Sequence, residues 1–497
     1  MASDSRYILR MFYMISTYWP HILFVLSIAM GAAAAIHATM TKEEVRAALG
    51  WVGVILLSPI VGAVFYAIAG INRIRRASLS LRRDALIPEA DLDELESFDA
   101  DAELVISGFG RRFAALQTLG DRVARNPIAT GNTIDMLETG DDCYNAMQSA
   151  IGNAQRSILL ETYIFDRDRI GMRIADALIA AAKRGVEVRV LIDAVGARYS
   201  VPSILSYLDK GGVRVAVFNG NVIMGLRLPY ANLRTHRKIL VVDGGLVLTG
   251  GMNIREGFSR ETVGDSFARD THFSVTGPVV ADLFNVAAED WRFTTGEELT
   301  TEAWRIAPPE RAVGDPVFIR AVASGPDRSI ETNHKMLMGA FSVARKSIRI
   351  MSPYFLPDRE LISALATAAR RGVEVDIVVP QVNNLVLVDR AMTAQFDQIV
   401  ANYCRIWRAS GAFSHSKLLS IDGVWSYVGS SNLDPRSLRL NFEIDLEVLN
   451  EGFANEIDEH IDEAIKSASP VTLNGLRSRP FLVRLLDKIL WLGSPYL

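Results

Sequence analysis

The N-terminal part of the chain contains two long, uncharged and largely apolar runs, at residues 18–37 and 48–70. Each run is long enough for a helix that crosses the hydrocarbon core of a bilayer, which takes about 20 residues. A short polar loop joins the two runs. The pattern therefore predicts a hairpin of two transmembrane helices within residues 1–76.

Positive charge flanks this predicted hairpin at both of its ends. Arg6 and Arg10 precede the first run, whereas the loop between the runs holds two basic residues beside two acidic ones. Because basic residues mark the cytoplasmic side of a membrane, we expect both ends and everything after them to be cytoplasmic. The expected location is a membrane, crossed more than once. The arginines after the second run are Arg73, Arg75, Arg76, Arg82 and Arg83.

These apolar runs also fit two other interpretations. Arg6, Arg10 and the alanines at 32–35 fit the basic region and cleavage site of a signal peptide. The second run contains Pro59 and several glycines, so it also fits a buried core helix. Retained anchors are favoured, because the first run is long and a second run with an arginine-rich end follows at once.

Beyond a polar connector at residues 77–120, one pattern of strands and helices occurs twice. Apolar strands are expected at 156–165 (RSILLETYIF) and 346–355 (KSIRIMSPYF), each with a tyrosine near its end. A helix that ends at glycine and a valine-rich strand follow each, as AAKRGVEVRVLI and AARRGVEVDIVV. Strand, helix and strand make a parallel crossover unit. We therefore expect an α/β fold with two duplicated domains, 121–296 and 297–470, whose mixed sheets are flanked by helices and which face each other across a pseudo-twofold axis.

The third repeated element is the motif HxKxxxxD, in HRKILVVDGGLVLTGGMN and in HSKLLSIDGVWSYVGSSN. An Asp-Gly pair between two apolar strands predicts a hairpin in each copy. Histidine and lysine stand two positions apart, so on a strand they project from the same face. The candidate catalytic residues are His236, Lys238 and Asp243 in the first copy and His415, Lys417 and Asp422 in the second.

An imidazole beside a fixed positive charge suits chemistry at a phosphodiester. Lysine can hold the anionic oxygens, while histidine, with a pKa of about 6.5, can attack phosphorus or transfer a proton. With two copies, one imidazole can form a phosphohistidine while the other serves the leaving and incoming alcohols as acid and base. For Asp243 and Asp422, a role as turn residues or lysine partners is favoured over direct catalysis.

Small residues that close each motif are candidates to bind the phosphoryl oxygens, since they let the backbone approach a ligand closely. A metal site is not expected, because each histidine sits beside a lysine and no dense cluster of ligand residues surrounds it. No cofactor is expected either. The candidate phosphate-binding residues are Gly250, Gly251, Asn253, Ser430, Ser431 and Asn432.

Composition narrows the range of partners. In 497 residues, 49% are hydrophobic and 22% charged, which excludes a disordered chain. The net charge of -4 argues against a protein that binds the nucleic-acid backbone non-specifically. Cys143 and Cys404 are far apart in sequence, so they indicate neither a metal motif nor a disulfide framework.

The paired HxKxxxxD motifs with their GG-x-N and GSSN endings resemble the phospholipase D superfamily. The segments ARDTHFSVTGP from residue 268 and GSSNLDPRSLRLNFEIDLEV from residue 429 are similar to bacterial cardiolipin synthases. The resemblance implies a phosphatidyltransferase that joins two phosphatidylglycerol molecules to give cardiolipin and glycerol, with the first histidine as nucleophile. It implies phosphatidylglycerol and membrane lipids as partners, and it leaves the oligomeric state open.

The same resemblance implies that an acidic residue downstream of each histidine orients its ring. By position these residues are Asp270 and Glu443; the alternative is that they are surface or salt-bridge acids. The first half departs from the usual pattern, because its interval from His236 to Asp270 is longer and Ala268 stands where related enzymes often have tryptophan.

Other functions remain as alternatives. If water reaches the covalent intermediate, the same residues make a phospholipase D hydrolase, and another alcohol acceptor or phospholipid donor makes a different phosphatidyltransferase. A nuclease of the superfamily is opposed by the membrane hairpin and the acidic charge balance. A non-catalytic membrane scaffold is opposed by the intactness of both motifs.

The tail at residues 471–497 predicts an amphipathic helix, FLVRLLDKILWL. Leu482, Leu485, Leu486 and Ile489 share one helical stripe, and the polar residues Arg484, Asp487 and Lys488 form another. Such a helix either lies on a membrane surface, with Trp491 at the interface, or packs against the catalytic body. The pattern does not choose between these two.

Overall fold

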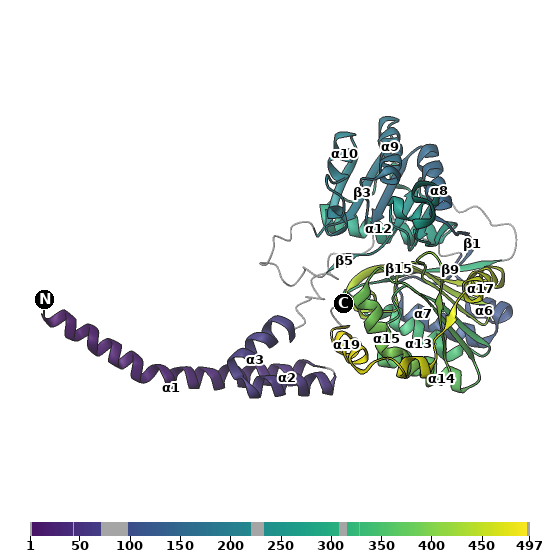
Figure 1. The fold of residues 1–497 in the computed structure, drawn as a ribbon. Helices are drawn as coiled ribbons and strands as arrows, with labels where there is room; N and C mark the ends of the chain where they lie inside the picture. The colour runs from purple at the N-terminus through teal and green to yellow at the C-terminus, as the bar shows by residue number, and fades with distance from the viewer. Residues whose placement is uncertain are drawn as a thin grey trace. The chain divides into compact units, whose positions relative to one another are not determined.

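The computed structural model describes residues 2–42, 44–70, 98–219, 233–307, 316–327 and 329–494. The chain divides into two units, Met1–Arg75 and Arg76–Leu497 (Figure 1). The basic cluster expected after the second apolar run, Arg73 to Arg83, lies outside the described residues.

The first unit is built on the long helix α1 (Ala2–Thr41). Within the described chain, its stretch Ser16–Thr41 is the one helix long and apolar enough to cross a membrane. Large apolar side chains along it are exposed, Phe24 and Val25 among them. The first expected span is therefore a single apolar helix, as the pattern predicts.

The second expected span, residues 48–70, is not one continuous helix. Helix α2 (Val45–Leu57) ends before Ser58, α3 (Pro59–Phe65) begins after it, and a π-helical turn (Tyr66–Gly70) follows. Pro59 causes the break, because it has no amide hydrogen and disfavours a helical backbone at the residue before it. Helix α3 packs closely on α2: a Cβ added to Gly62 would lie 2.6 Å from the carbonyl oxygen of Val54. A hairpin of two spanning helices is thus not confirmed.

The second unit is organised around one 16-stranded mixed sheet, in the order β16-β12-β11-β10-β13-β14-β15-β9-β1-β8-β7-β6-β2-β3-β4, with β5 paired to β15. The strands of the first half are β1 (Ala129–Leu137), β2 (Ser157–Thr162), β3 (Glu187–Asp193), β4 (Arg214–Phe218), β5 (Arg234–Thr235), β6 (Ile239–Val242), β7 (Leu246–Gly250) and β8 (His272–Thr276). Those of the second are β9 (Val317–Ser324), β10 (Ser347–Met351), β11 (Glu374–Pro380), β12 (Arg405–Ala409), β13 (Leu418–Ile421), β14 (Trp425–Gly429), β15 (Asn441–Leu449) and β16 (Ser469–Pro470).

The strand order confirms the duplication. Read outward from the central antiparallel pair β1 and β9, the first half runs β8, β7, β6, β2, β3, β4 and the second runs β15, β14, β13, β10, β11, β12. Both crossover units have the expected form, β2 parallel to β3 and β10 parallel to β11. Shared sheet strands therefore join two copies of the same α/β unit.

Helices cover the sheet on each half. Their apolar faces fill two cores, one around Ile158, Ile174 and Val190 and the other around Ile348, Leu365 and Ile377. In Figure 1 the helices of the first half and those of the second lie on opposite sides of the shared strands β9 and β15. The main ones are α8 (Gly140–Asn153), α9 (Arg169–Lys183), α10 (Leu205–Lys210) and α12 (Val279–Thr295), then α13 (Thr332–Val343), α14 (Arg359–Arg370), α15 (Val386–Val400) and α17 (Glu451–Lys466).

Part of the segment expected to be a connector, 77–120, belongs to the folded body. Helices α6 (Ala102–Phe109) and α7 (Arg111–Val123) contribute Val105, Phe113 and Leu116 to the core of the second half. Charged residues dilute the apolar stripe of α7, which is why the sequence there reads as a polar linker. Residues 77–97 of the expected connector lie outside the described residues.

Candidate active site

Both HxK segments lie in extended chain immediately before a hairpin strand, rather than in the strand itself. The hairpins β6–β7 and β13–β14 form as expected. Their turns place Asp243 and Gly244 at φ 51° and 62°, and Asp422 and Gly423 at φ 57° and 66°. Left-handed backbone at both central positions is what an Asp-Gly pair accommodates. The turn chemistry thus sets the register of each hairpin and the position of the histidine before it.

The two motif aspartates bind the backbone, in agreement with the turn role that the sequence favours for them over direct catalysis. The Asp243 carboxylate accepts hydrogen bonds from the amides of residues 155–157, at 2.7 to 3.0 Å. The Asp422 carboxylate accepts from the amides of residues 345–347 in the same way, and from the Arg112 guanidinium. Each aspartate fastens the hairpin turn to the chain that enters β2 or β10. Neither lines the cavity that holds the histidines.

His236 and His415 line a single cavity of about 1190 Å³. Each half contributes to this cavity because its HxK segment lies near the centre of the joint sheet. There β5 pairs with β15, and Arg269 forms a β-bridge with Ser414. The two imidazoles therefore serve one site.

Buried carboxylates hold both imidazoles, and each carboxylate comes from the opposite half of the molecule. Nδ1 of His236 lies 2.9 Å from Oε2 of Glu443, and Nδ1 of His415 lies 2.7 Å from Oδ2 of Asp270. The backbone follows the same exchange: the amide of His236 donates to the Phe442 carbonyl and that of His415 to the Arg269 carbonyl, at 2.8 and 2.7 Å. The sequence points to these two acids, but the pairing expected from their order, Asp270 with His236 and Glu443 with His415, is wrong: each carboxylate holds the other histidine.

The electrostatics keep the imidazoles neutral and the carboxylates ionised. Burial lowers the pKa of His236, and burial together with Lys417 lowers the pKa of His415 to about 4. Burial works against ionisation of Asp270, but Lys417 and His415 outweigh it and bring the Asp270 pKa below its usual range. For Glu443, burial is likewise outweighed by His236 and Lys238, and its pKa is lowered. An ionised acceptor on Nδ1 leaves Nε2 as the nitrogen with a free lone pair.

The motif lysines lie beside their own histidines. Nζ of Lys238 donates to the backbone carbonyl of His236 at 2.5 Å, and Nζ of Lys417 lies 3.3 Å from Nε2 of His415. Both are almost fully buried. Burial lowers the pKa of Lys238 to about 7 and that of Lys417 to about 8. Their ammonium charge is therefore sensitive to pH near neutrality.

The residues expected to bind phosphate are of three kinds, namely asparagines, serines and glycines. Asn253 and Asn432 line the cavity. Ser430 and Ser431 are committed to carboxylates: the Ser430 hydroxyl donates to Glu443 at 2.6 Å, and Ser431 donates to Asp445.

The two glycines of the set provide room. A Cβ added at Gly251 would lie 2.4 Å from Oδ1 of Asp270, so glycine lets this carboxylate approach the histidine of the other half. Gly250 has φ 152°, and a Cβ there would lie 2.8 Å from the α-carbon of His272.

Two tyrosines belong to the site although the motif analysis did not select them. The Tyr163 ring lies 5.2 Å from the His236 ring and the Tyr354 ring 5.9 Å from the His415 ring, measured between centroids. Burial raises the pKa of both phenols, so they remain neutral hydrogen-bond donors. The tyrosine near the end of each repeated strand was the signal that could have identified them.

Arginines also line the cavity and were not predicted, because they are scattered along the sequence and have no common spacing. Carboxylates line the same cavity, and one of them, Asp166, pairs with Arg255 at 3.1 Å. The four arginines are Arg167, Arg234, Arg255 and Arg436.

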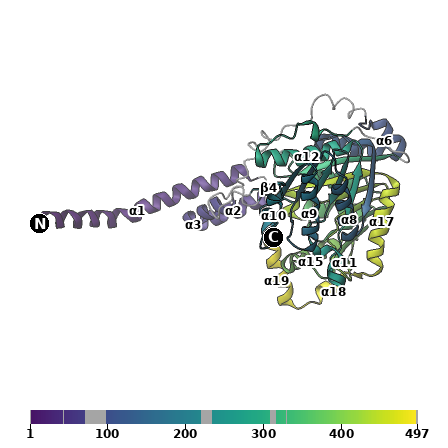
Figure 2. The same ribbon diagram turned by 90° about the horizontal axis from the view of Figure 1, so that it is seen from above.

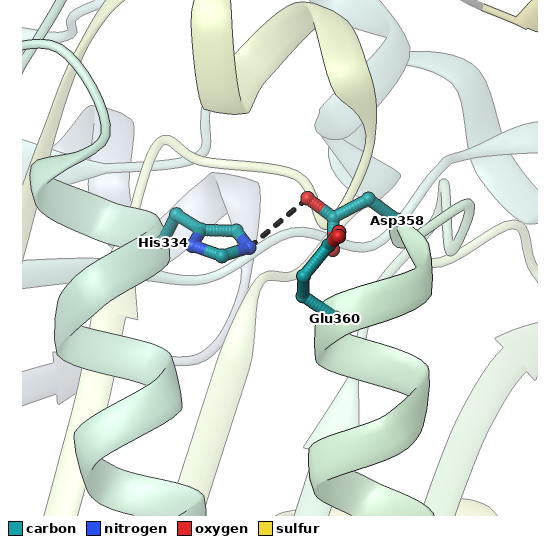
Figure 3. Close-up of side chains that lie close together, drawn as sticks. All are labelled: His334, Asp358 and Glu360. Carbon is teal, nitrogen blue, oxygen red and sulfur yellow. Dashed lines mark ion pairs between the residues drawn. The ribbon is translucent and has the colours of Figure 1, made fainter. Parts of the chain in front are cut away.

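Among the described residues, one group has ligand atoms close enough to hold a metal ion: His334, Asp358 and Glu360, within 4.8 Å of one another (Figure 3). Asp358 caps helix α14 through the Leu361 amide and pairs with His334 at 3.0 Å. The hydrogen bond to Asp358 raises the pKa of His334. Protonated, this imidazole is an ion-pair partner and has no free lone pair for a metal. None of the three lines the histidine cavity.

Known protein families match both the N-terminal unit and the duplicated domains of the chain. The family model described as "Cardiolipin synthase, PLD-like domain" matches residues 147–262 and 337–465, and "Phospholipase_D-nuclease N-terminal" matches residues 29–70. A cardiolipin synthase of Alkalihalophilus pseudofirmus is 31% identical over 90% of this chain and 88% of its own length. Cardiolipin synthase A of Pseudomonas fluorescens is 31% identical over 96% of this chain and 99% of its own.

Among solved structures, phosphatidylserine synthase of Haemophilus influenzae has the same fold. The TM-score is 0.57 at 17% sequence identity, and the match covers 77% of this chain and all of that one. With duplicated PLD-like domains around two histidines, and relatives that match along nearly its whole length, the chain belongs to the family of PLD-like cardiolipin synthases.

Proposed function

We propose that this protein is a cardiolipin synthase that transfers a phosphatidyl group between two phosphatidylglycerol molecules through a phosphohistidine. The observation that carries the proposal is the pair of imidazoles in one cavity, each held by a buried carboxylate. The relatives named cardiolipin synthase supply the identity of the reaction.

In the first step, Nε2 of His236 attacks the phosphorus of the donor lipid. A P–N bond forms, the P–O bond to the glycerol headgroup breaks, and His415 gives a proton to the departing glycerol oxygen. Glu443 holds the proton on Nδ1 of His236 and stabilises the positive charge that develops on this ring. His415 is protonated for this role when the lipid phosphate binds, because a nearby anion raises the pKa of an imidazole.

In the second step, the hydroxyl of another phosphatidylglycerol gives its proton to His415 and its oxygen attacks the phosphorus. The P–N bond breaks, cardiolipin leaves, and both histidines return to their starting states. No nucleotide is required, because the phosphodiester bond that forms resembles the one that was broken. The arginines that line the cavity would attract the lipid phosphates.

The size of the cavity supports two lipid headgroups rather than one. Its volume of about 1190 Å³ exceeds the roughly 300–1,000 Å³ of a usual ligand pocket. A second phospholipid could then bind before water reaches the intermediate, which favours transfer over hydrolysis.

The decisive experiment is a product analysis of purified protein in vesicles of labelled phosphatidylglycerol. Cardiolipin and glycerol released in equal amounts would support the proposal. Phosphatidic acid as the main product would instead identify a hydrolase, and another lipid product made on addition of a different alcohol would identify another phosphatidyltransferase.

We also propose that the N-terminal unit anchors the protein in a bacterial inner membrane, crossing it more than once, with the catalytic domains cytoplasmic. The apolar helix α1 and the arginines after the second run support this arrangement. Protease added to sealed right-side-out vesicles tests it. Residues after 98 should be protected there and cleaved in inverted vesicles, and the reverse pattern would contradict the orientation.

A further inference from the structure

The C-terminal helix α19 (Phe481–Leu492) docks on the body through Asp487 and Lys488, and Trp491 near its end packs against the core of the second half. Of its residues, all described, only Asp487 is buried. Its carboxylate accepts hydrogen bonds from Arg390 of α15 at 3.3 Å and from Arg479 at 2.7 Å. The Lys488 ammonium donates to the Ala394 carbonyl of α15 at 2.5 Å. Both views place α19 beside α15 (Figures 1 and 2).

The apolar side of the same helix faces outward. Leu482, Ile489 and Leu492 are 74%, 54% and 72% exposed. Phe481, Leu485 and Leu486 are exposed as well. This is the reverse of the usual arrangement, in which an amphipathic helix buries its apolar side against the protein. A contiguous apolar patch on a surface marks a place where something else binds.

The exposed apolar surface continues to the mouth of the active-site cavity. Residues 385–387, where α15 begins, are exposed leucines and a valine, and Val382 just before them is 77% exposed. Val382, Leu385 and Val388 line the cavity, and so does Ser494, which follows α19. The cavity therefore opens beside this apolar surface.

We propose that α19 and residues 382–388 form a docking surface that inserts into the bilayer leaflet facing the catalytic domains and sets the cavity mouth against the lipid headgroups. This inference rests on the proposed function in one respect, namely that the substrate is a lipid. A bilayer suits the surface better than a second copy of the chain, because the substrate enters the cavity from the bilayer.

Charge on the helix agrees with that choice. Arg484 is exposed among the apolar residues of α19, and Arg477 is exposed just before the helix. The one acidic residue of α19, Asp487, is buried in its ion pairs. The helix thus presents apolar and positively charged groups to its surroundings, a combination that binds anionic membrane surfaces.

A fluorescent label read by lipid-borne quenchers tests the docking without relying on activity. The full chain carries Leu486→Cys, labelled, in vesicles of phosphatidylglycerol and phosphatidylcholine with nitroxide groups on the acyl chains. Cys143 and Cys404 are buried and should not react. Leu104→Cys on α6 is the matched control, since Leu104 is 45% and Leu486 44% exposed.

We expect strong quenching of the label at residue 486 and little at residue 104. Equal quenching at both positions, or none at either, would overturn the proposal. So would a label at 486 that is shielded both from lipid nitroxides and from a water-soluble quencher, since another protein surface would then cover the helix.

A second measurement asks whether docking serves the reaction. The double variant Leu482→Asp with Leu486→Asp should lower turnover on vesicles by about an order of magnitude, because charged groups oppose insertion of the helix. Leu104→Asp should not, and all variants should keep the melting temperature of the parent. If the protein without substitutions makes no cardiolipin, yet the label on the Leu486→Cys variant is quenched, the proposed function fails and the docking surface stands. Unchanged turnover in the double variant would overturn the link between docking and catalysis.

Discussion

At the scale of single residues, the proposed mechanism gives the two histidines different tasks although their surroundings are alike. Each imidazole has a buried carboxylate on Nδ1 and a lysine close by. The local chemistry is therefore alike at the two rings, and trapping of the phosphoprotein identifies the nucleophile.

Replacing either histidine by alanine should reduce the rate of cardiolipin formation by at least about a thousandfold, because a nucleophile or a proton carrier is lost. The two variants should differ in trapping: with radiolabelled donor lipid, His415→Ala should accumulate phosphoprotein and His236→Ala should not. Turnover that survives in both variants would remove the basis of the two-histidine mechanism.

Glu443→Gln should keep the fold but lower the rate about a hundredfold or more, because an amide does not hold the Nδ1 proton as a carboxylate does. The loss should appear in kcat rather than in KM. Glu459→Gln, an exposed carboxylate on α17, is the control and should leave the rate unchanged. A Glu443→Gln enzyme with normal kcat would show that the carboxylate does not position His236.

The activity should fall in two stages as pH rises, first near 7, where Lys238 loses its proton, and then near 8, where Lys417 loses its own. Burial lowers the pKa of each lysine. The positive charge that attracts phosphate is therefore present below that pKa and absent above it. Lys417→Arg should move the alkaline limit upward, because a guanidinium stays charged. An alkaline limit that is the same in both proteins would exclude Lys417 as its source.

At the scale of elements, the Asp-Gly turns show how a motif residue can hold the backbone around a site in place. Each aspartate ties its turn to the chain that enters the neighbouring strand. The spacing of HxKxxxxD thus corresponds to the length of the strand that lies between the histidine and the Asp-Gly turn.

Asp243→Ala should lower the free energy of unfolding by about 2 kcal/mol, since three backbone amides lose their acceptor. Any loss of rate should parallel the loss of folded protein, with kcat per folded molecule nearly unchanged. Denaturant unfolding, followed together with lipid turnover, checks this. A stable Asp243→Ala protein with greatly reduced kcat would return the residue to the catalytic set.

The helices show a limit of pattern analysis. The apolar run at 48–70 predicts one helix, but Pro59 divides this segment into α2 and α3. The amphipathic pattern of α19 is real as well, yet its polar side faces the body. A periodic pattern says which residues share a face, and the neighbours in space decide where that face points.

At the scale of the whole molecule, the exchange of carboxylates makes the two halves interdependent. A double-mutant cycle on the free energy of unfolding should detect coupling of about 0.5–3 kcal/mol between His236 and Glu443. The pair His236 and Asp270 should couple much less, because Asp270 contacts His415. Equal coupling in both pairs would contradict the observed partners.

The sequence by itself determined the repeat, the α/β class, the HxK pairs with their hairpins and the family resemblance. These follow from residues near one another in the chain, where spacing alone dictates turns, strand faces and helix stripes. Only the tertiary structure decided which carboxylate serves which histidine, because His236 and Glu443 are 207 residues apart and His415 and Asp270 are 145 apart. Pairing across such distances depends on how two sheets join, and local patterns carry no record of that.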